Sequence, residues 1–134
     1  MLENNKVHNK DILEYFSGVS DKSVDLFILD PPYYRVVGDK WDNQWFTIED
    51  WIAWCDKWIA EVNRTSKLSG SVWLFGFPYQ LMHLFPIMIK NGFTFRQQIM
   101  VNKGLQAVAG RTSKNLKMFP TATESIFFFH KECR

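Results

Sequence analysis

The chain has 134 residues, 46% hydrophobic and 22% charged, which fits one globular domain and excludes a disordered or fibrous chain. No apolar run approaches the ~18 residues that cross a bilayer, and no signal-peptide pattern opens the chain, so we expect a cytoplasmic protein. The cysteines at positions 55 and 133 are 78 positions apart, which suggests neither a disulfide framework nor a zinc site. We therefore expect no metal.

The formal net charge of +2 conceals an uneven distribution of charge. Residues 1–61 carry twelve acids and six bases, whereas residues 62–123 carry eight bases and no acid. Asymmetry of this kind indicates a polyanionic partner. The four bases within residues 64–96 have an equally good explanation, which is that they solvate the ends of helices and strands. The other four lie in a polar stretch over residues 103–118 that we expect to be a long functional loop. They are Lys103, Arg111, Lys114 and Lys117.

In chain order, the first expected element is a short helical turn over residues 12–16. Residues 24–30 form an almost continuous apolar run that two prolines end, which predicts a buried strand. After a loop, Thr47 offers an N-cap for a helix that we expect to reach about residue 66. The apolar residues of this helix, Cys55 among them, fall on one stripe, so we expect Cys55 in the core.

The second half of the chain continues the alternation of strands and helices. Ser69-Gly70 is expected to end the helical segment, and residues 71–77 predict a second buried strand. A helix is expected over residues 79–90, although Pro86 inside it favours a kink or an earlier break. Residues 93–101 and 124–130 are the third and fourth expected strands.

This alternation predicts an α/β fold with right-handed βαβ units and a mostly parallel sheet covered by helices on both faces. The last two strands are joined by a loop without a helix, so we expect them to be antiparallel. In open α/β sheets, ligands bind beyond the carboxyl ends of the strands. The residues that follow the first strand are therefore the first candidates for a site.

Asp30-Pro31-Pro32-Tyr33 follows that strand directly. Its carboxylate is available to a ligand, its prolines leave carbonyls without neighbouring N–H groups, and its tyrosine offers a stacking surface. Judged by composition alone, the segment is more simply a rigid turn after a strand. Its position after a hydrophobic strand, however, resembles the catalytic Asp-Pro-Pro-Tyr motif of the S-adenosylmethionine-dependent amino-methyltransferases that modify adenine N6 or cytosine N4 in DNA.

The resemblance extends over nearly the whole chain. Residues 22–25, 38–42, 69–75 and 123–129 look like landmarks of the class-β, MboII-like group, in which the catalytic motif precedes the cofactor motif. This resemblance implies a partial doubly wound, Rossmann-like methyltransferase fold. It also implies S-adenosylmethionine as cofactor, double-stranded DNA as partner, and a cytoplasmic protein of bacterial or phage type.

The resemblance also implies a mechanism. The carboxylate of Asp30 and the carbonyl of Pro31 would accept hydrogen bonds from the exocyclic amine and direct its lone pair toward the methyl group. Pro32 completes the motif, and Tyr33 would stack on a base flipped out of the duplex. A leading aspartate favours adenine N6 over cytosine N4. Neither cysteine follows a proline in a loop, which excludes the C5-cytosine class with its cysteine nucleophile.

Other positions match the family less specifically. Asp11 and Ile12 occupy the place where the family contacts the adenosine of the cofactor, but Asp11 is equally well placed to cap the helical turn that follows. Trp41 and Asp42 would border the target-base pocket, or simply pack in a loop. With Trp41, the bases of the 103–118 stretch are the expected DNA contacts.

The family's Phe-x-Gly-x-Gly turn, which holds the cofactor where only glycine fits, is absent from this sequence. We therefore expect residues 1–134 to be the catalytic half of a methyltransferase domain, without its target-recognition region. Two explanations remain open, a fragment and one subunit of a split enzyme whose complementing chain supplies the rest. A non-catalytic DNA-binding subunit and a methyltransferase for RNA or protein glutamine are the alternative functions.

Overall fold

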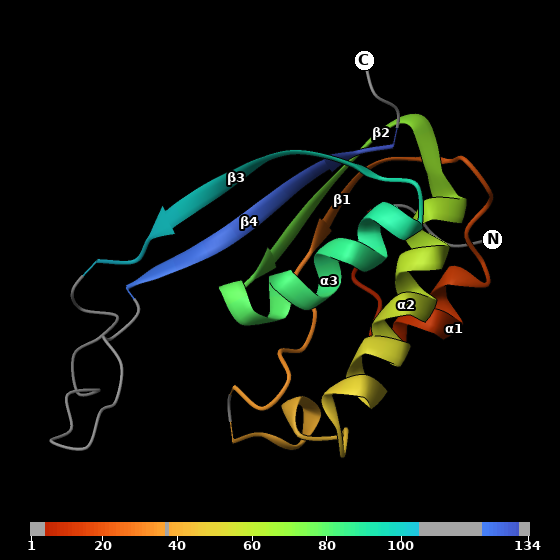
Figure 1. The fold of residues 1–134 in the computed structure, drawn as a ribbon. Coiled ribbons are helices and arrows are strands. Elements are labelled where there is room, and N and C mark those ends of the chain that lie inside the picture. Colours follow the sequence, from red (N-terminus) through yellow and green to blue (C-terminus); the bar gives the residue numbers. More distant parts are fainter. Residues whose placement is uncertain (1–4, 37, 105–121, 132–134) are drawn as a thin grey trace, which may run out of the picture.

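The computed structural model describes residues 5–36, 38–104 and 122–131 (Figure 1). The elements in chain order are α1 (Ile12–Phe16), β1 (Val24–Leu29), the 3-10 turn η1 (Lys40–Asp42), α2 (Ile48–Thr65), β2 (Ser66–Gly76), α3 (Pro78–Lys90), β3 (Thr94–Asn102) and β4 (Thr123–His130). The helices and strands agree in kind and order with those expected from the sequence.

The four strands form one sheet in the order β1-β2-β4-β3. β1 and β2 are parallel, and β4 is antiparallel to both β2 and β3. Consequently β1, β2 and β3 run in one direction and β4 alone runs against them. The predicted α/β fold with a mostly parallel sheet and an antiparallel C-terminal strand is confirmed. The insertion of β4 between β2 and β3 was not expected.

Helices cover only one face of this sheet in the described part of the chain (Figure 1). The expectation of helices on both faces was wrong here, and the strand order explains why. The connections β1-α2-β2 and β2-α3-β3 both move across the sheet in the same direction, and right-handed crossovers that move the same way place their helices on the same side. Leu26 and Ile28 of β1 are 51% and 68% exposed as a result.

The helices α2 and α3 both contribute to the cover, and α2 is the longer of the two. Its N-terminus carries a capping box in which the Thr47 hydroxyl accepts from the backbone N–H of Asp50 and the Asp50 carboxylate accepts from that of Thr47, both at 3.1 Å. The predicted apolar stripe is fully buried at four positions, namely Trp51, Cys55, Ile59 and Val62. Cys55 is a core residue as expected, and burial raises the pKa of its thiol.

β2 begins at Ser66, directly after α2, which differs from the predicted separation of helix and strand near Ser69-Gly70. Its pairing with β1 shifts register between Val24 and Leu26, so β2 bulges there. A Cβ on Gly70 would lie 2.8 Å from the carbonyl oxygen of Lys67. The glycine that was expected to end the helical segment is therefore needed inside the bulged strand.

The helix α3 continues through Pro86 to Lys90, so the earlier break did not occur. Pro78 stands in its first turn, where a missing N–H costs nothing. Within the described residues, no helix is both long and apolar enough to cross a membrane.

Candidate active site

The Asp30–Tyr33 segment lies at the carboxyl end of β1 and is anchored to the core from α2. The indole N–H of Trp51 donates to the carbonyl of Pro32 at 3.0 Å, and the Trp51 side chain is fully buried. A rigid two-proline turn tied to a buried ring has little freedom to move. This arrangement fixes the direction in which the flanking Asp30 and Tyr33 side chains leave the backbone.

Tyr33 joins two carboxylates. Its hydroxyl lies 2.5 Å from Oδ1 of Asp30 and 3.0 Å from Oε1 of Glu124, and its ring packs edge-on against Phe77 with centroids 5.3 Å apart. Burial, followed by the hydrogen bonds and charges of Asp30 and Glu124, raises the pKa of Tyr33 well above its ordinary value of 10.0. The phenol therefore stays protonated and remains a hydrogen-bond donor.

Glu124 is the site residue to which the sequence analysis assigned no role. It is separated from Tyr33 by 91 positions, and only the insertion of β4 beside β2 brings the start of β4 to the carboxyl end of β2. The expected antiparallel direction of the last strand could have indicated this role. A strand that runs against its neighbours begins at the edge of the sheet where those neighbours end, so Glu124 at its start had to lie near the carboxyl end of an adjacent strand.

A cavity of about 280 Å³ opens beside the motif. Its walls hold Asp30, the two prolines, and apolar side chains from α1, β1 and α2, namely Ile12, Phe16, Ile28, Leu29, Trp54 and Trp58. The structure thus brings Ile12 and Asp30, both expected to contact the cofactor, to one cavity. Asp11 caps α1 by accepting from the backbone N–H groups of Leu13 at 2.9 Å and Glu14 at 3.4 Å, which confirms its capping role.

Trp41 and Asp42 lie in η1 and differ sharply in exposure. Asp42 is fully buried, and its Oδ2 accepts from the backbone N–H of Val36 at 2.6 Å. This contact holds the loop after the motif in place, so its packing role is the one the structure supports. Trp41 is 51% exposed and available to a partner.

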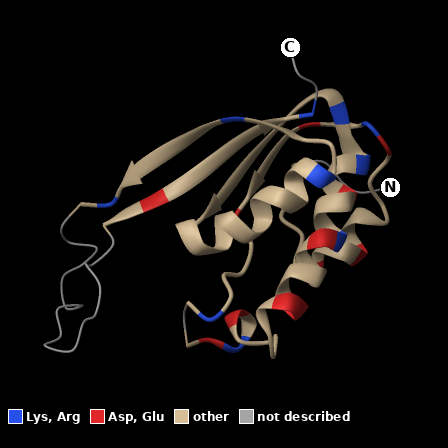
Figure 2. Cartoon of the chain, viewed as in Figure 1, with Lys and Arg blue, Asp and Glu red and all other residues tan. Residues whose placement is uncertain are grey.

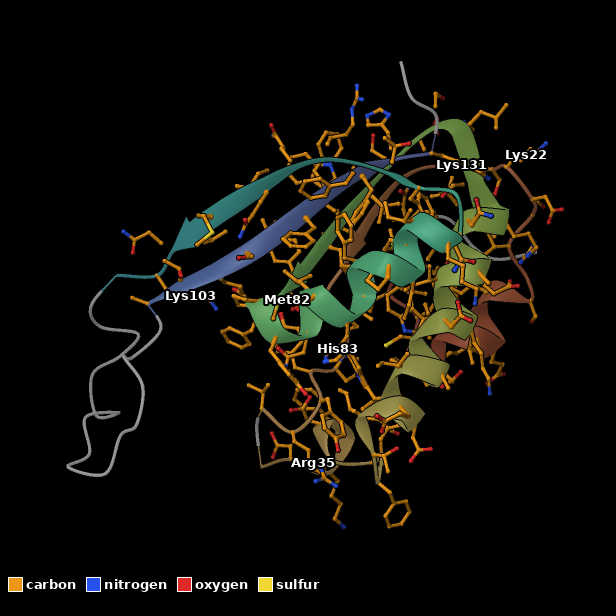
Figure 3. The ribbon with its side chains drawn as sticks, in the orientation of Figure 1. Lys22, Arg35, Met82, His83, Lys103 and Lys131 are labelled. Carbon is orange, nitrogen blue, oxygen red and sulfur yellow. The ribbon has the colours of Figure 1, made fainter. Side chains whose placement is uncertain are left out.

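The expected DNA contacts fall into two groups. Arg111, Lys114 and Lys117 lie outside the described residues. Lys103 follows the end of β3, next to the start of β4 (Figure 3), where its ammonium lies 2.6 Å from Oε2 of Glu124.

Ion pairs account for part of the charge asymmetry along the sequence, and basic and acidic residues lie close together on several elements (Figure 2). Four of the bases in residues 62–123 form ion pairs, and every acidic partner comes from outside that range. The pairs are Arg64 with Asp21 and Glu61, Lys67 with Asp25, Lys90 with Asp56, and Lys103 with Glu124. For these bases, the asymmetry reflects pairing between distant segments and gives no separate indication of a polyanionic partner.

Comparison with known proteins identifies the family. The family model of the DNA methylases of the N6 and N4 type matches residues 24–133. The chain belongs to this DNA methylase family. Over 131 residues it is 28% identical to the type II methyltransferase M1.MboII of Moraxella bovis, covering 98% of this chain and 48% of that protein. It is 26% identical over 113 residues to M.HinfI of Haemophilus influenzae, covering 74% and 32%.

Solved structures of DNA methyltransferases share the Rossmann-like fold. TTHA0409 of Thermus thermophilus superposes with a TM-score of 0.67 at 22% identity, over 93% of this chain and 53% of that one. The cytosine-N4-specific PvuII DNA methyltransferase gives 0.64 at 18%, over 92% and 48%. The family uses S-adenosylmethionine, with which TTHA0409 has also been crystallised. This DNA methylase chain spans about half or less of the length of the curated relatives it matches.

Proposed function

We propose that this chain is the catalytic half of a DNA methyltransferase that moves the methyl group of S-adenosylmethionine to adenine N6. The observation that carries the proposal is the position of Asp30, at the carboxyl end of β1, hydrogen-bonded to Tyr33 and lining one cavity with Ile12. The leading aspartate of the motif favours adenine. Cytosine N4 is the alternative, since the family covers both bases.

The cavity fits one wall of a cofactor site. It combines a carboxylate, which suits a sulfonium cation, with the indole rings of Trp54 and Trp58, which suit an adenine ring. Asp11, Ile12 and Asp30 would hold the cofactor, and the cofactor would supply an electrophilic methyl group. The glycine turn that would close the other wall is not in this sequence.

The chemistry assigned to the protein is hydrogen bonding and orientation. The exocyclic amine of adenine is a poor nucleophile because its lone pair is delocalised into the ring. The carboxylate of Asp30 and the carbonyl of Pro31 would accept hydrogen bonds from the two N–H groups of the amine and so localise its lone pair toward the methyl group. The ring of Tyr33 would stack on the flipped base, with its hydroxyl held between Asp30 and Glu124.

A substitution at Asp30 tests this assignment. In the assembled enzyme, we expect Asp30→Ala to reduce transfer of labelled methyl groups to duplex DNA by ~10²-fold or more, as for loss of one preorganised hydrogen-bonding group. Asp25→Ala is the matched control, because Asp25 lies on β1, the strand that Asp30 follows, and pairs with Lys67 at the surface. Equal activity of the two variants would favour the non-catalytic DNA-binding subunit. Mass spectrometry of the product nucleosides distinguishes methylation at adenine N6 from methylation at cytosine N4. Transfer of labelled methyl groups to an RNA or to a protein, rather than to DNA, would identify the RNA or protein-glutamine methyltransferase.

We also propose that β1 is the surface on which the rest of the fold assembles. β1 lies at the edge of the sheet, and a second cavity of about 560 Å³ runs along it, lined in part by Leu26 and Ile28. An exposed apolar edge strand is a template for pairing with another strand. More than half of M1.MboII lies outside the part that matches this chain, which supports a complementing segment as the occupant, whether covalently joined or separate.

Two measurements test the complementation. The purified chain alone is expected to transfer no methyl group, and robust activity on its own would end the proposal. Joint substitution Leu26→Lys and Ile28→Lys should abolish association with a complementing polypeptide that carries the Phe-x-Gly-x-Gly turn, measured by sedimentation velocity. Met82→Lys with Met100→Lys, at exposed positions on α3 and β3, should leave association intact.

We also propose that Trp41, Arg111, Lys114 and Lys117 contact the DNA. Lys103, the other expected DNA contact, is paired with Glu124 and could reach a phosphate only by sharing that contact. Replacing Arg111, Lys114 and Lys117 by glutamine should weaken binding of a duplex and lower the slope of its salt dependence by about 0.9 for each phosphate that is no longer neutralised. A variant with Lys57→Gln, on α2, is the control. An unchanged slope in the triple variant would remove these three residues from the DNA interface.

A further inference from the structure

A chain of four polar side chains connects the candidate catalytic carboxylate with the end of β3. Asp30 contacts the Tyr33 hydroxyl at 2.5 Å, the same hydroxyl contacts Glu124 at 3.0 Å, and Glu124 contacts Lys103 at 2.6 Å. The Glu124 side chain is 13% exposed and that of Lys103 is 45% exposed. The family motif contains only the first two members of this chain.

The Tyr33 hydroxyl carries a single hydrogen but faces two acceptors. A phenol O–H donates one hydrogen bond, and ionised carboxylates can only accept. Because burial and both carboxylates raise the pKa of Tyr33, the hydroxyl keeps this hydrogen at neutral pH. Donation to Asp30 uses one acceptor position of its carboxylate and lowers its strength as an acceptor for a substrate amine, whereas donation to Glu124 leaves the full negative charge of Asp30 to the amine.

Asp30 and Glu124 thus compete for the hydrogen of the Tyr33 hydroxyl, and the charge of Lys103 affects this competition. A positive group 2.6 Å from Oε2 of Glu124 reduces the negative potential that Glu124 presents to the Tyr33 hydroxyl. Because Glu124 is largely buried, this effect is less screened than at a fully exposed pair. The shorter of the two contacts from Tyr33 is the one to Asp30, which is the direction expected when Lys103 weakens the other acceptor.

We propose that Glu124 is a positioning residue that competes with Asp30 for the Tyr33 hydroxyl, and that Lys103 sets the outcome of this competition. The proposal rests on the proposed function for its catalytic consequence, because the acceptor strength of Asp30 matters only if Asp30 accepts from the amine. The hydrogen-bond competition itself is a property of this chain and is measurable without activity.

The first test uses the chain alone, labelled with ¹³C at the ζ carbon of tyrosine, and Tyr33→Phe assigns the Tyr33 signal. Glu124→Gln removes a negative charge beside the hydroxyl, whereas Lys103→Met removes a positive charge. We expect the two variants to shift the Tyr33 signal in opposite directions, while Glu49→Gln, an exposed substitution on α2, leaves it in place. No shift in either variant, or shifts in the same direction, would overturn the proposal. Should Glu124→Gln not fold, Lys103→Met alone provides the test: a shift of the Tyr33 signal supports the proposal, and no shift overturns it.

The second test uses the assembled enzyme at saturating DNA. Glu124→Gln should lower kcat about five-fold, the equivalent of one ordinary hydrogen bond, with KM for S-adenosylmethionine unchanged. Lys103→Met should raise kcat, whereas an ion pair with a purely structural role would lower it in both variants. In a Tyr33→Phe background, Glu124→Gln should have no further effect. An additive effect in that background would overturn the proposal, whereas opposite spectral shifts without any methyl transfer would count against the proposed function alone.

Discussion

The two faces of the sheet are built from the same strands but differ in how far their apolar side chains are buried. On the face that the helices cover, Val72, Leu74 and Phe129 have no exposed surface. On the other face, Leu26 and Ile28 of the neighbouring strand are more than half exposed. The covered face is a finished core, whereas the open face has the composition of a core without its cover. Folding of this chain should therefore depend on one face and its assembly on the other.

Paired truncations should reveal the difference most strongly. Leu74 pairs with Leu29 on one side and Phe127 on the other, so Leu74→Ala leaves a cavity in the core and should cost about 2–5 kcal/mol of unfolding free energy. Ile28→Ala removes a side chain that is already exposed and should cost less than about 1 kcal/mol. Urea unfolding of both variants measures this. Similar losses would mean that the open face is buried in the free chain through self-association.

Trp51 links the covered core to the site, and its replacement tests how far they depend on each other. Trp51→Phe leaves the Pro32 carbonyl without its indole donor and opens a gap in the core, so we expect a loss of about 1–3 kcal/mol in unfolding free energy. Trp41→Phe, at an exposed position, should change stability by less than about 0.5 kcal/mol. Equal stability of the two variants would show that the turn holds its place without the anchor.

The stability of α2, one of the helices that cover the sheet, depends on the capping box at its N-terminus. Thr47→Ala removes half of the capping box and should lower stability by about 1 kcal/mol, since the N–H of Asp50 loses its acceptor. Thermal unfolding measures the loss. Thr47→Ser retains the hydroxyl and should recover most of it. A Thr47→Ala variant as stable as the parent chain would mean that packing alone fixes this end of the helix.

Local pattern was enough to predict the elements and the motif. The apolar run of β1, the N-cap at Thr47 and the Asp30–Tyr33 turn are each encoded within a few neighbouring residues. What the sequence did not predict depends on distant pairing. The position of β4, the contact of Glu124 with Tyr33 and the helices on one face all follow from strand order, and strand order is set by contacts between segments tens of residues apart.

Local pattern also misled at the end of α2. Ser69 and Gly70 belong to residue types that are frequent in turns, so they predict a break between helix and strand. The pairing of Ser66 with Val24 overrides that preference and starts the strand early. The cofactor contacts predicted for Asp11 and Ile12 remain predictions, because they concern a ligand. The DNA contacts predicted for Arg111, Lys114 and Lys117 also remain predictions, because these residues lie outside the described part of the chain.

The smallest expected effect concerns the ion pair between the two covering helices. Asp56 of α2 accepts from Lys90 at 2.8 Å and from Asn91 at 3.1 Å, and these contacts hold the pKa of Asp56 below its ordinary value of 3.8. Because the folded pKa is the lower one, the contribution of Asp56 to stability is complete above the unfolded pKa and is lost as the pH falls through the folded value. The pair is exposed, so Asp56→Asn should cost well under ~1 kcal/mol at neutral pH.

The pH dependence distinguishes this contribution from a packing effect. The stability difference between the parent chain and Asp56→Asn should be present at neutral pH and should narrow below about pH 4, where the carboxylate is protonated in the unfolded state. Urea midpoints measured across this range test it, with Asp39→Asn in the loop before η1 as the control. A difference that stays constant down to strongly acidic pH would mean that shape and neutral hydrogen bonds, rather than charge, join α2 to α3. The covered face would then be held together without electrostatics, and its contrast with the open face would be one of apolar burial alone.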